Sequence, residues 1–193
     1  MSQIEINDTP DTSIQKNKKN AFFSFIRDTV IALALGIFLF LVFQFFFQFY
    51  TVDGPSMNET LADGQRMLVL KTTKQPSRGD VIIFHTPPAS GVDEIFVKRV
   101  IGLPGDVIEI KNGVVFVNNE PLQEDYIINN PKINMEAVVV KDKEYFVLGD
   151  NRLVSYDSHN FGCVPQENII GKALFVVWPT SGWGNKINYS YSF

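Results

Sequence analysis

Ser56 is the first of three features whose side chains could act together in covalent chemistry. It follows Gly54-Pro55, a pair that forms a tight turn and exposes the next side chain and its backbone N–H. A serine in this setting is most often an ordinary turn residue. As a nucleophile it would need a neighbouring base, because a serine hydroxyl reacts weakly at neutral pH.

Lys98 could be that base. It lies within EIFVKRVI (94–101), where strand alternation puts Phe96, Lys98 and Val100 on one face and Arg99 on the other. One of the two cations must therefore share a face with apolar neighbours. Burial can lower a lysine pKa by about 3 to 5 units, whereas arginine keeps its proton. The alternative is an ordinary lysine that reaches solvent past its strand.

The third feature is the polar, glycine-bounded loop GDNRLVSYDSHNFG at 149–162. Its composition also fits a solvated surface loop, and no second acidic cluster supports paired-carboxylate chemistry. A Ser-His-Asp triad would need His85 or His159, and nothing in the sequence connects either to Ser56. The loop offers two carboxylates and two hydroxyls that could support a site: Asp150, Asp157, Ser155 and Ser158.

The composition argues against several other classes of protein. A net charge of -4 with no long basic stripe gives no reason to expect nucleic-acid binding. One cysteine, Cys163, excludes an internal disulfide and a cysteine-only metal cluster, and we read it as a small, partly buried apolar residue. With two histidines in the chain, we expect neither a zinc site nor any other metal or cofactor.

An uncharged segment at 29–50 (TVIALALGIFLFLVFQFFFQFY) predicts a transmembrane helix. At 1.5 Å per residue it spans about 33 Å, against a hydrocarbon core of about 30 Å. Its apolar core is longer than that of a signal peptide, and the bulky FFFQFY end offers no small-x-small cleavage site. We therefore expect a permanent anchor, with Ser56 at most about 20 Å from its end.

Residues 1–28 read as a flexible cytoplasmic tail that is polar and basic near the membrane. Lysines at 16, 18 and 19 and Arg27 precede the apolar segment, whereas Thr51-Val52-Asp53 follow it. The positive-inside rule then predicts a single-pass protein of the cell membrane, with residues 51–193 outside the cytoplasm.

Residues 51–193 predict a mainly β domain, an antiparallel sheet or barrel with a β-rich insert at about 111–142. Asn112-Gly113 within IEIKNGVVFV is typical of a tight hairpin turn. The expected strands are short, apolar and separated by Gly, Pro, Asn or Asp, and lie at 66–71, 80–85, 94–101, 106–110, 114–117, 137–140, 144–149 and 173–178.

Together these pieces resemble bacterial type I signal peptidase, a membrane-bound serine protease with a Ser-Lys dyad. The segment GPSM at 54–57 with Thr60-Leu61 resembles its nucleophile box, and KRVIGLPGD at 98–106 matches its lysine box throughout. GDNR at 149–152, with the Ser and Asp residues that follow, resembles its third box. The resemblance covers about 29–178, and the single anchor without a disulfide suits the Gram-positive branch.

The resemblance implies a role for each residue. Ser56 would be the acylating nucleophile and Lys98 the general base. Ser155 would orient the lysine amine, while Asp157 and Asp150 would brace the site. It also implies substrates with small residues just before the cut, as in secretory signal peptides. For the substrate pocket we expect apolar side chains around Val52 and Met57.

Three positions depart from the family pattern. Glu59 stands where the nucleophile box usually has proline, and His159 where the third box usually has arginine. Gly54 stands where some members have a serine that supplies a second oxyanion donor. The alternative function is therefore a catalytically weak paralogue that acts as a membrane-anchored binding or assembly factor.

Overall fold

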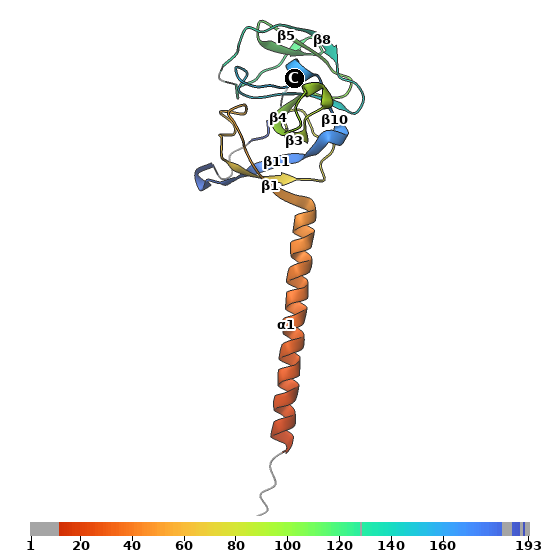
Figure 1. Ribbon diagram of the computed structural model, residues 1–193, viewed down its shortest axis with the longest axis vertical. Coiled ribbons are helices and arrows are strands. Elements are labelled where there is room, and N and C mark those ends of the chain that lie inside the picture. The colour runs from red at the N-terminus through yellow and green to blue at the C-terminus, as the bar shows by residue number, and fades with distance from the viewer. Residues whose placement is uncertain (1–11, 128, 183–186, 190, 192–193) are drawn as a thin grey trace, which may run out of the picture. The chain divides into compact units, whose positions relative to one another are not determined.

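The computed structural model describes residues 12–127, 129–182, 187–189 and 191, and divides the chain into two units, residues 1–45 and 46–193. The first unit consists of helix α1, Thr12–Phe46, whose last residue begins the second unit (Figure 1). Within it, Phe22–Phe46 is long and apolar enough to cross a membrane. The expected boundaries shift: Thr12–Asp28, expected to be flexible, is helical, and residues 1–11 of the expected tail lie outside the described residues.

The prediction that 29–50 is a single helix is wrong at its C-terminal end. Phe47–Thr51 forms strand β1, which pairs with β2 (Arg66–Leu70) from Phe47 opposite Leu70 to Thr51 opposite Arg66. The β-branched and aromatic residues at this end favour a strand once a partner is available. Gln48 therefore belongs to the sheet.

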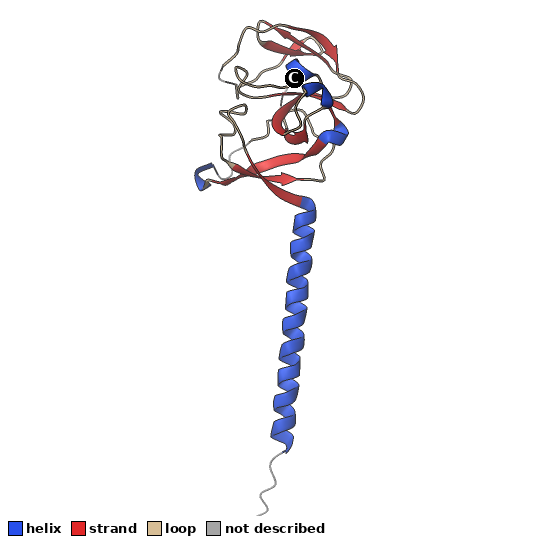
Figure 2. Ribbon diagram, viewed as in Figure 1, coloured by secondary structure: helices blue, strands red, loops and turns tan. Residues whose placement is uncertain are grey.

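The catalytic unit expected from the sequence is mainly antiparallel β-sheet, as predicted (Figure 2). Its larger sheet has seven strands in the order β1-β2-β11-β3-β4-β9-β10, so β1 and β10 are its edges. Beyond β1 and β2, its strands are β3 (Val81–His85), β4 (Ile95–Gly102), β9 (Glu144–Leu148), β10 (Val164–Pro165) and β11 (Ile169–Trp178). Short helices are η1 (Pro88–Ser90), α2 (Ser158–Phe161), η2 (Gln166–Asn168) and η3 (Thr180–Gly182).

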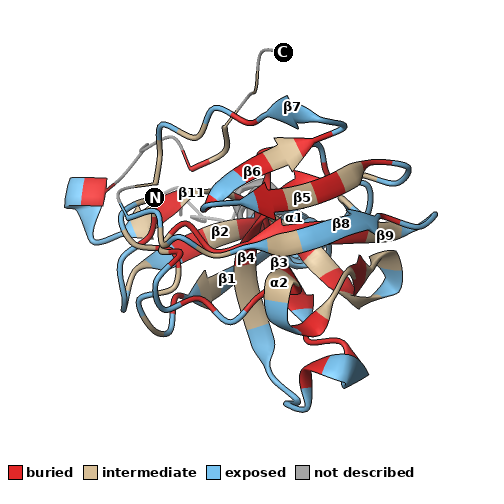
Figure 3. Ribbon diagram, turned by 90° about the horizontal axis from the view of Figure 1, so that it is seen from above, coloured by how far each residue is buried: buried red, intermediate tan, exposed pale blue. Residues whose placement is uncertain are grey.

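A second sheet of four strands, in the order β7-β6-β5-β8, forms the β-rich satellite. Its strands are β5 (Val107–Lys111), β6 (Val114–Val117), β7 (Glu120–Pro121) and β8 (Met135–Val139), so the satellite begins at Val107 and not at about 111. The Asn112-Gly113 turn has the expected positive φ angles, 51° and 85°. Figure 3 shows β8 largely exposed, while its neighbour β5 alternates toward the core.

From Lys98 to Gly102, strand β4 is buried on both faces, and this decides where the two cations lie. On one face Val100 belongs to a core cluster with Ile82 and Phe84 of β3. On the other, Ile101 packs with Ile108 of the satellite sheet. Consequently Lys98 and Arg99 are both buried, at 3% and 1% exposure, although the sequence required only one of them to be so.

Gly171 lets β11 approach β2 closely, and this contact generates a stability prediction. A Cβ at this position would lie 2.4 Å from the Leu70 carbonyl oxygen and 2.9 Å from Val69 Cγ1. We expect Gly171→Ala to lower the free energy of unfolding by about 1 to 3 kcal/mol, measured by thermal unfolding in detergent. Gly36→Ala in α1, where a Cβ meets nothing within 4 Å, is the control and should leave the domain's Tm unchanged. An unaltered Tm in Gly171→Ala would contradict this packing.

Candidate active site

Ser56 lies in a compact turn that two loops hold in place. Val52 N donates to Gln65 O at 2.8 Å, which closes the base of the segment between β1 and β2. Gly54 has a φ of 81°, a left-handed conformation that suits glycine at the turn. From the other side, Asn151 donates its backbone N–H to Ser56 O at 3.0 Å and its side-chain Nδ2 to Pro55 O at 3.2 Å. The backbone of the turn is thus fixed while the serine side chain stays partly accessible.

Lys98 Nζ lies 2.8 Å from Ser56 Oγ, so the two residues that the sequence singled out are in hydrogen-bond contact. The amine also lies 4.9 Å from the centre of the Phe96 ring. Burial lowers the pKa of Lys98 to about 8, although the charges of Asp157 and Asp150 oppose the shift. At pH 7 a group with that pKa is neutral in about one molecule in ten, compared with about one in 3,000 at a pKa of 10.5.

The Ser56–Lys98 pair lines a cleft of about 280 Å³. Val52 and Met57, the two residues predicted for the substrate pocket, line it too and are almost fully buried in its wall. Its rim carries Ile95 and Val154, both about half exposed. A larger hollow of about 500 Å³ near β9 and β10 is lined by side chains of mixed charge and does not include this pair. The cleft with the serine is where chemistry can occur.

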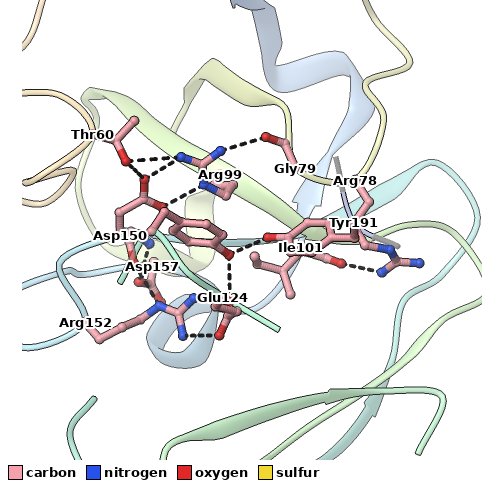
Figure 4. Close-up of polar contacts among 12 residues, drawn as sticks. Thr60, Arg78, Gly79, Arg99, Ile101, Glu124, Asp150, Arg152, Asp157 and Tyr191 are labelled. Atoms are coloured by element: carbon pink, nitrogen blue, oxygen red, sulfur yellow. Dashed lines mark hydrogen bonds and ion pairs between the residues drawn. The ribbon is translucent and has the colours of Figure 1, made fainter. Parts of the chain in front are cut away.

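Asp150 binds Arg99 and not the lysine. Arg99 Nε and Nη2 donate to the two oxygens of Asp150 at 2.9 and 2.6 Å, a bidentate pair (Figure 4). Thr60 Oγ1 also donates to Asp150, and Arg99 Nη1 donates to the carbonyls of Gly79 and Ile187 at 2.8 and 2.9 Å. Burial disfavours the Arg99 charge, but the hydrogen bonds and charge of Asp150 outweigh it and raise the arginine pKa.

Asp157 anchors the second half of the loop. Its carboxylate accepts from Gly149 N at 2.9 Å and caps α2, where His159 N donates to it at 3.3 Å. The His159 Nδ1 atom lies 2.6 Å from the same carboxylate. This one contact occupies the place where the family pattern has an arginine, which would reach the carboxylate with two donors. Asp157 is 1% exposed, so its charge acts on Lys98 across a poorly solvated interior.

Gly149 lies between the turn that carries Ser56 and the side chain of Ser155, in a space too small for a side chain. A Cβ here would lie 2.2 Å from Ser155 Oγ and 2.6 Å from Ser56 O. The Ser155 hydroxyl is buried and has no hydrogen-bond partner among the described residues. Its predicted role in orienting the lysine amine stays a prediction, and a buried free hydroxyl this close to the site is placed to accept or donate one bond.

The remaining candidates lie away from the serine. His85 ends β3 with an exposed side chain, and the ring of His159 contacts Asp157. Cys163 is half-buried and packs against an apolar cluster, and burial raises its thiol pKa to about 11. In the described part of the chain no group of three or more His, Cys, Asp or Glu side chains is arranged to hold a metal ion.

Sequence reasoning missed the residues that support the site from a distance. It assigned no role to Arg99, because alternation left open whether the second face of β4 is covered. It also missed Asn151, although this residue is inside the loop that was singled out. Glu124 and Tyr126 lie in a polar stretch of the satellite without any periodic pattern, and no local signal could have identified them.

Comparisons with known proteins were made for the whole chain. Residues 23–178 match the family model described as signal peptidase, peptidase S26. A probable signal peptidase I-1 from Synechocystis is 41% identical over 176 residues, covering 86% of this chain and 90% of that protein. Signal peptidase IB from Staphylococcus aureus is 35% identical over 185 residues, covering 84% and 95%. A crystal structure of a signal peptidase I from Enterococcus faecalis is 32% identical with a TM-score of 0.45, covering 51% of this chain and 96% of that one.

The burial of Lys98 predicts a specific dependence of stability on pH. Folding lowers its pKa from 10.5 to about 8, so the protonated form destabilises the fold below pH 8. This cost is relieved as pH rises from 8 toward 10.5. We expect the unfolding free energy of wild type, relative to Lys98→Met, to increase by about 2 kcal/mol between pH 7 and 9.5. Denaturant titrations of both proteins measure this difference, and equal pH slopes would contradict a desolvated lysine.

Proposed function

This chain belongs to the signal peptidase family, peptidase S26, and from that membership we propose that it is a membrane-anchored serine endopeptidase that cleaves signal peptides from exported preproteins with a Ser56–Lys98 dyad. The observation that carries the dyad is the 2.8 Å contact between Ser56 Oγ and the amine of Lys98, a residue that is 3% exposed. A solvated lysine in that position would hold its proton and could not act as a base.

The reaction divides into acylation and hydrolysis. Neutral Lys98 takes the proton of Ser56 as Oγ attacks the scissile carbonyl, and the protonated amine then gives it to the leaving amine. The product of this step is an ester between Ser56 and the cleaved signal peptide. Lys98, neutral again, activates a water molecule that hydrolyses the ester. The backbone N–H of Ser56 would stabilise the oxyanion, and Gly54 contributes no side-chain donor.

The cleft fits the substrates that the relatives' names suggest. Val52 and Met57 form an apolar wall beside the serine, and about 280 Å³ leaves room for small side chains before the cut. The A-x-A pattern of secretory signal peptides has the required size and polarity. The cleft side chains therefore support a preference for small residues at the cleavage site.

Membrane anchoring follows from the sequence around α1. The apolar part of the helix, Phe22–Phe46, would be about 37 Å long, enough to span a bilayer. Ser56 is about ten residues beyond its end, a reach of at most about 35 Å. Basic residues on the N-terminal side favour a cytoplasmic N-terminus and an extracytoplasmic active site. The cleavage sites of translocated signal peptides lie in the same layer, beside membrane lipid.

The dyad predicts the behaviour of three variants. In detergent or lipid, wild type should cleave a preprotein, whereas Ser56→Ala, Lys98→Ala and Lys98→Arg should lose at least about three orders of magnitude in rate, because each removes the nucleophile or a base that can deprotonate. Gel-based cleavage assays measure this. His85→Ala and His159→Ala are controls and should keep measurable activity.

Full activity in any of the three dyad variants would exclude the proposed mechanism. Acylation of Ser56 by a penem inhibitor, read by mass spectrometry, separates an enzyme from a binding or assembly factor with this fold. Neither adduct nor turnover in wild type would favour the binding factor.

The pH dependence of cleavage provides an independent prediction. Since the neutral amine is the reacting form, kcat/KM should fall about tenfold per pH unit below an apparent pKa of about 8 and level off above it. Initial rates at low preprotein concentration between pH 6 and 10 give the profile. An apparent pKa near 10 in the kcat/KM profile would indicate a solvated lysine instead.

A further inference from the structure

Glu124 belongs to the satellite segment between β7 and β8, yet its carboxylate is buried against the loop of the active site. The side chains of Glu124 and Arg152 are 4% and 5% exposed, and Arg152 Nη1 donates to Glu124 Oε2 at 3.0 Å. Arg152 Nη2 donates to the other carboxylate oxygen, which also accepts from Tyr126 OH. Figure 4 shows the carboxylate facing the Arg152 guanidinium. No other buried ion pair in the described part of the chain joins the satellite to the 149–157 loop.

One chain of contacts leads from Glu124 to the nucleophile. The same guanidinium that Glu124 holds donates its Nε to Gly149 O at 3.0 Å. Gly149 in turn is packed so closely against Ser56 O and Ser155 that a single added carbon would collide with both. A shift of Arg152 therefore moves the peptide that fixes the serine turn and the free hydroxyl beside it.

A second chain of contacts leads to the other side of the same loop. Tyr126, whose hydroxyl donates to Glu124, places its ring 4.2 Å from the Arg99 guanidinium. Arg99 holds Asp150 with two hydrogen bonds. Glu124 thus contacts both residues, Arg152 and Tyr126, through which the satellite supports the stretch from Gly149 to Arg152.

We propose that Glu124 is a positioning residue for the Ser56–Lys98 site, so that a segment of the satellite sheet completes the active site from outside the catalytic core. The inference rests on the proposed function. Without the Glu124 carboxylate, Arg152 is a buried cation that has lost its hydrogen-bonded counterion. The charge of Asp157 also acts on Arg152. We expect the guanidinium to shift toward that charge and away from Gly149 O. Ser56 loses its fixed position relative to Lys98, which slows acylation, while the apolar side chains of Val52 and Met57 remain in the wall of the cleft.

A second buried pair at the same junction provides a matched control. Arg78 Nη2 lies 2.9 Å from Asp106 Oδ2, with side-chain exposures of 13% and 11%, and Asp106 precedes the first strand of the satellite. The Asp106 carboxylate accepts from Arg78, Leu103 N and Asn118, all of which lie outside the 149–157 loop. Asp106→Asn therefore makes the same chemical change as Glu124→Gln, a carboxylate to an amide, away from the site.

The test compares the two variants in the full chain in detergent, at a temperature below both Tm values. We expect Glu124→Gln to lower kcat for preprotein cleavage at least about tenfold with KM within about threefold, and to lower the rate of Ser56 acylation by a penem similarly. Asp106→Asn should lose comparable Tm but keep kcat within about threefold. Glu124→Asp, which keeps the charge at shorter reach, should fall between wild type and Glu124→Gln.

Arg152→Lys tests the same contact from its other side and does not depend on the folding of Glu124→Gln. It keeps a cation beside Glu124 but has no Nε to donate to Gly149 O, so kcat should fall with KM again retained. Because both residues act through one contact, Glu124→Gln/Arg152→Lys should be no slower than the slower single variant, which is non-additivity.

Three results would overturn the inference. They are a kcat for Glu124→Gln within threefold of wild type, equal losses of kcat in Glu124→Gln and Asp106→Asn, or additive losses in the double variant. If wild type cleaves the preprotein and Ser56→Ala does not, such a result leaves the proposed function standing. If wild type neither cleaves nor is acylated, the proposed function and the inference both fail.

Discussion

Two adjacent cations in the part of β4 that is buried on both faces set the main physical constraint on this domain. Lys98 and Arg99 point to opposite sides of β4, and each side is closed by a different layer of apolar side chains. An isolated buried charge is costly, so each cation needs its own solution. Lysine can give up its proton and become a base, whereas arginine cannot and must find a carboxylate. One strand thus presents a reactive amine on one face and a fixed ionic support on the other.

The loop at 149–157 serves both faces at once. Asp150 neutralises Arg99, and the charge of Asp157 keeps the pKa of Lys98 from falling as far as burial alone would take it. Between them Gly149 and Asn151 contact the backbone of the serine turn. Residues of one short loop therefore act on Lys98, Arg99 and Ser56. A small displacement of the loop changes the surroundings of all three residues together.

The sequence predicted the fold class, most strands and the residues in contact at the site. Apolar segments with turn signals identified β2 to β6, β8, β9 and β11, with errors at their ends, but not β1 or the two-residue strands β7 and β10. The family resemblance paired Ser56 with Lys98 across 42 positions. Prediction from the sequence failed where tertiary contacts decide the secondary structure of a segment or the burial of a residue. The apolar segment predicts helix as far as Tyr50, whereas Phe47–Thr51 pairs with β2. Strand alternation left open whether the Arg99 face of β4 is covered, and Arg99 is buried. Glu124 carries no local signal, since only folding brings it to Arg152.

The position of β11 in the main sheet has a consequence for how the protein matures. Without β11 the main sheet would consist of two separate groups of paired strands, β1-β2 and β3-β4-β9-β10. Strand β11 joins them because it pairs with both β2 and β3. Ser56 follows the first strand of one group, and Lys98 lies on the second strand of the other. A protein chain is synthesised from its N-terminus, and pairings between segments that are far apart in the sequence form late in folding. The contact between Ser56 and Lys98 therefore becomes stable only once β11, which ends at Trp178, has been synthesised.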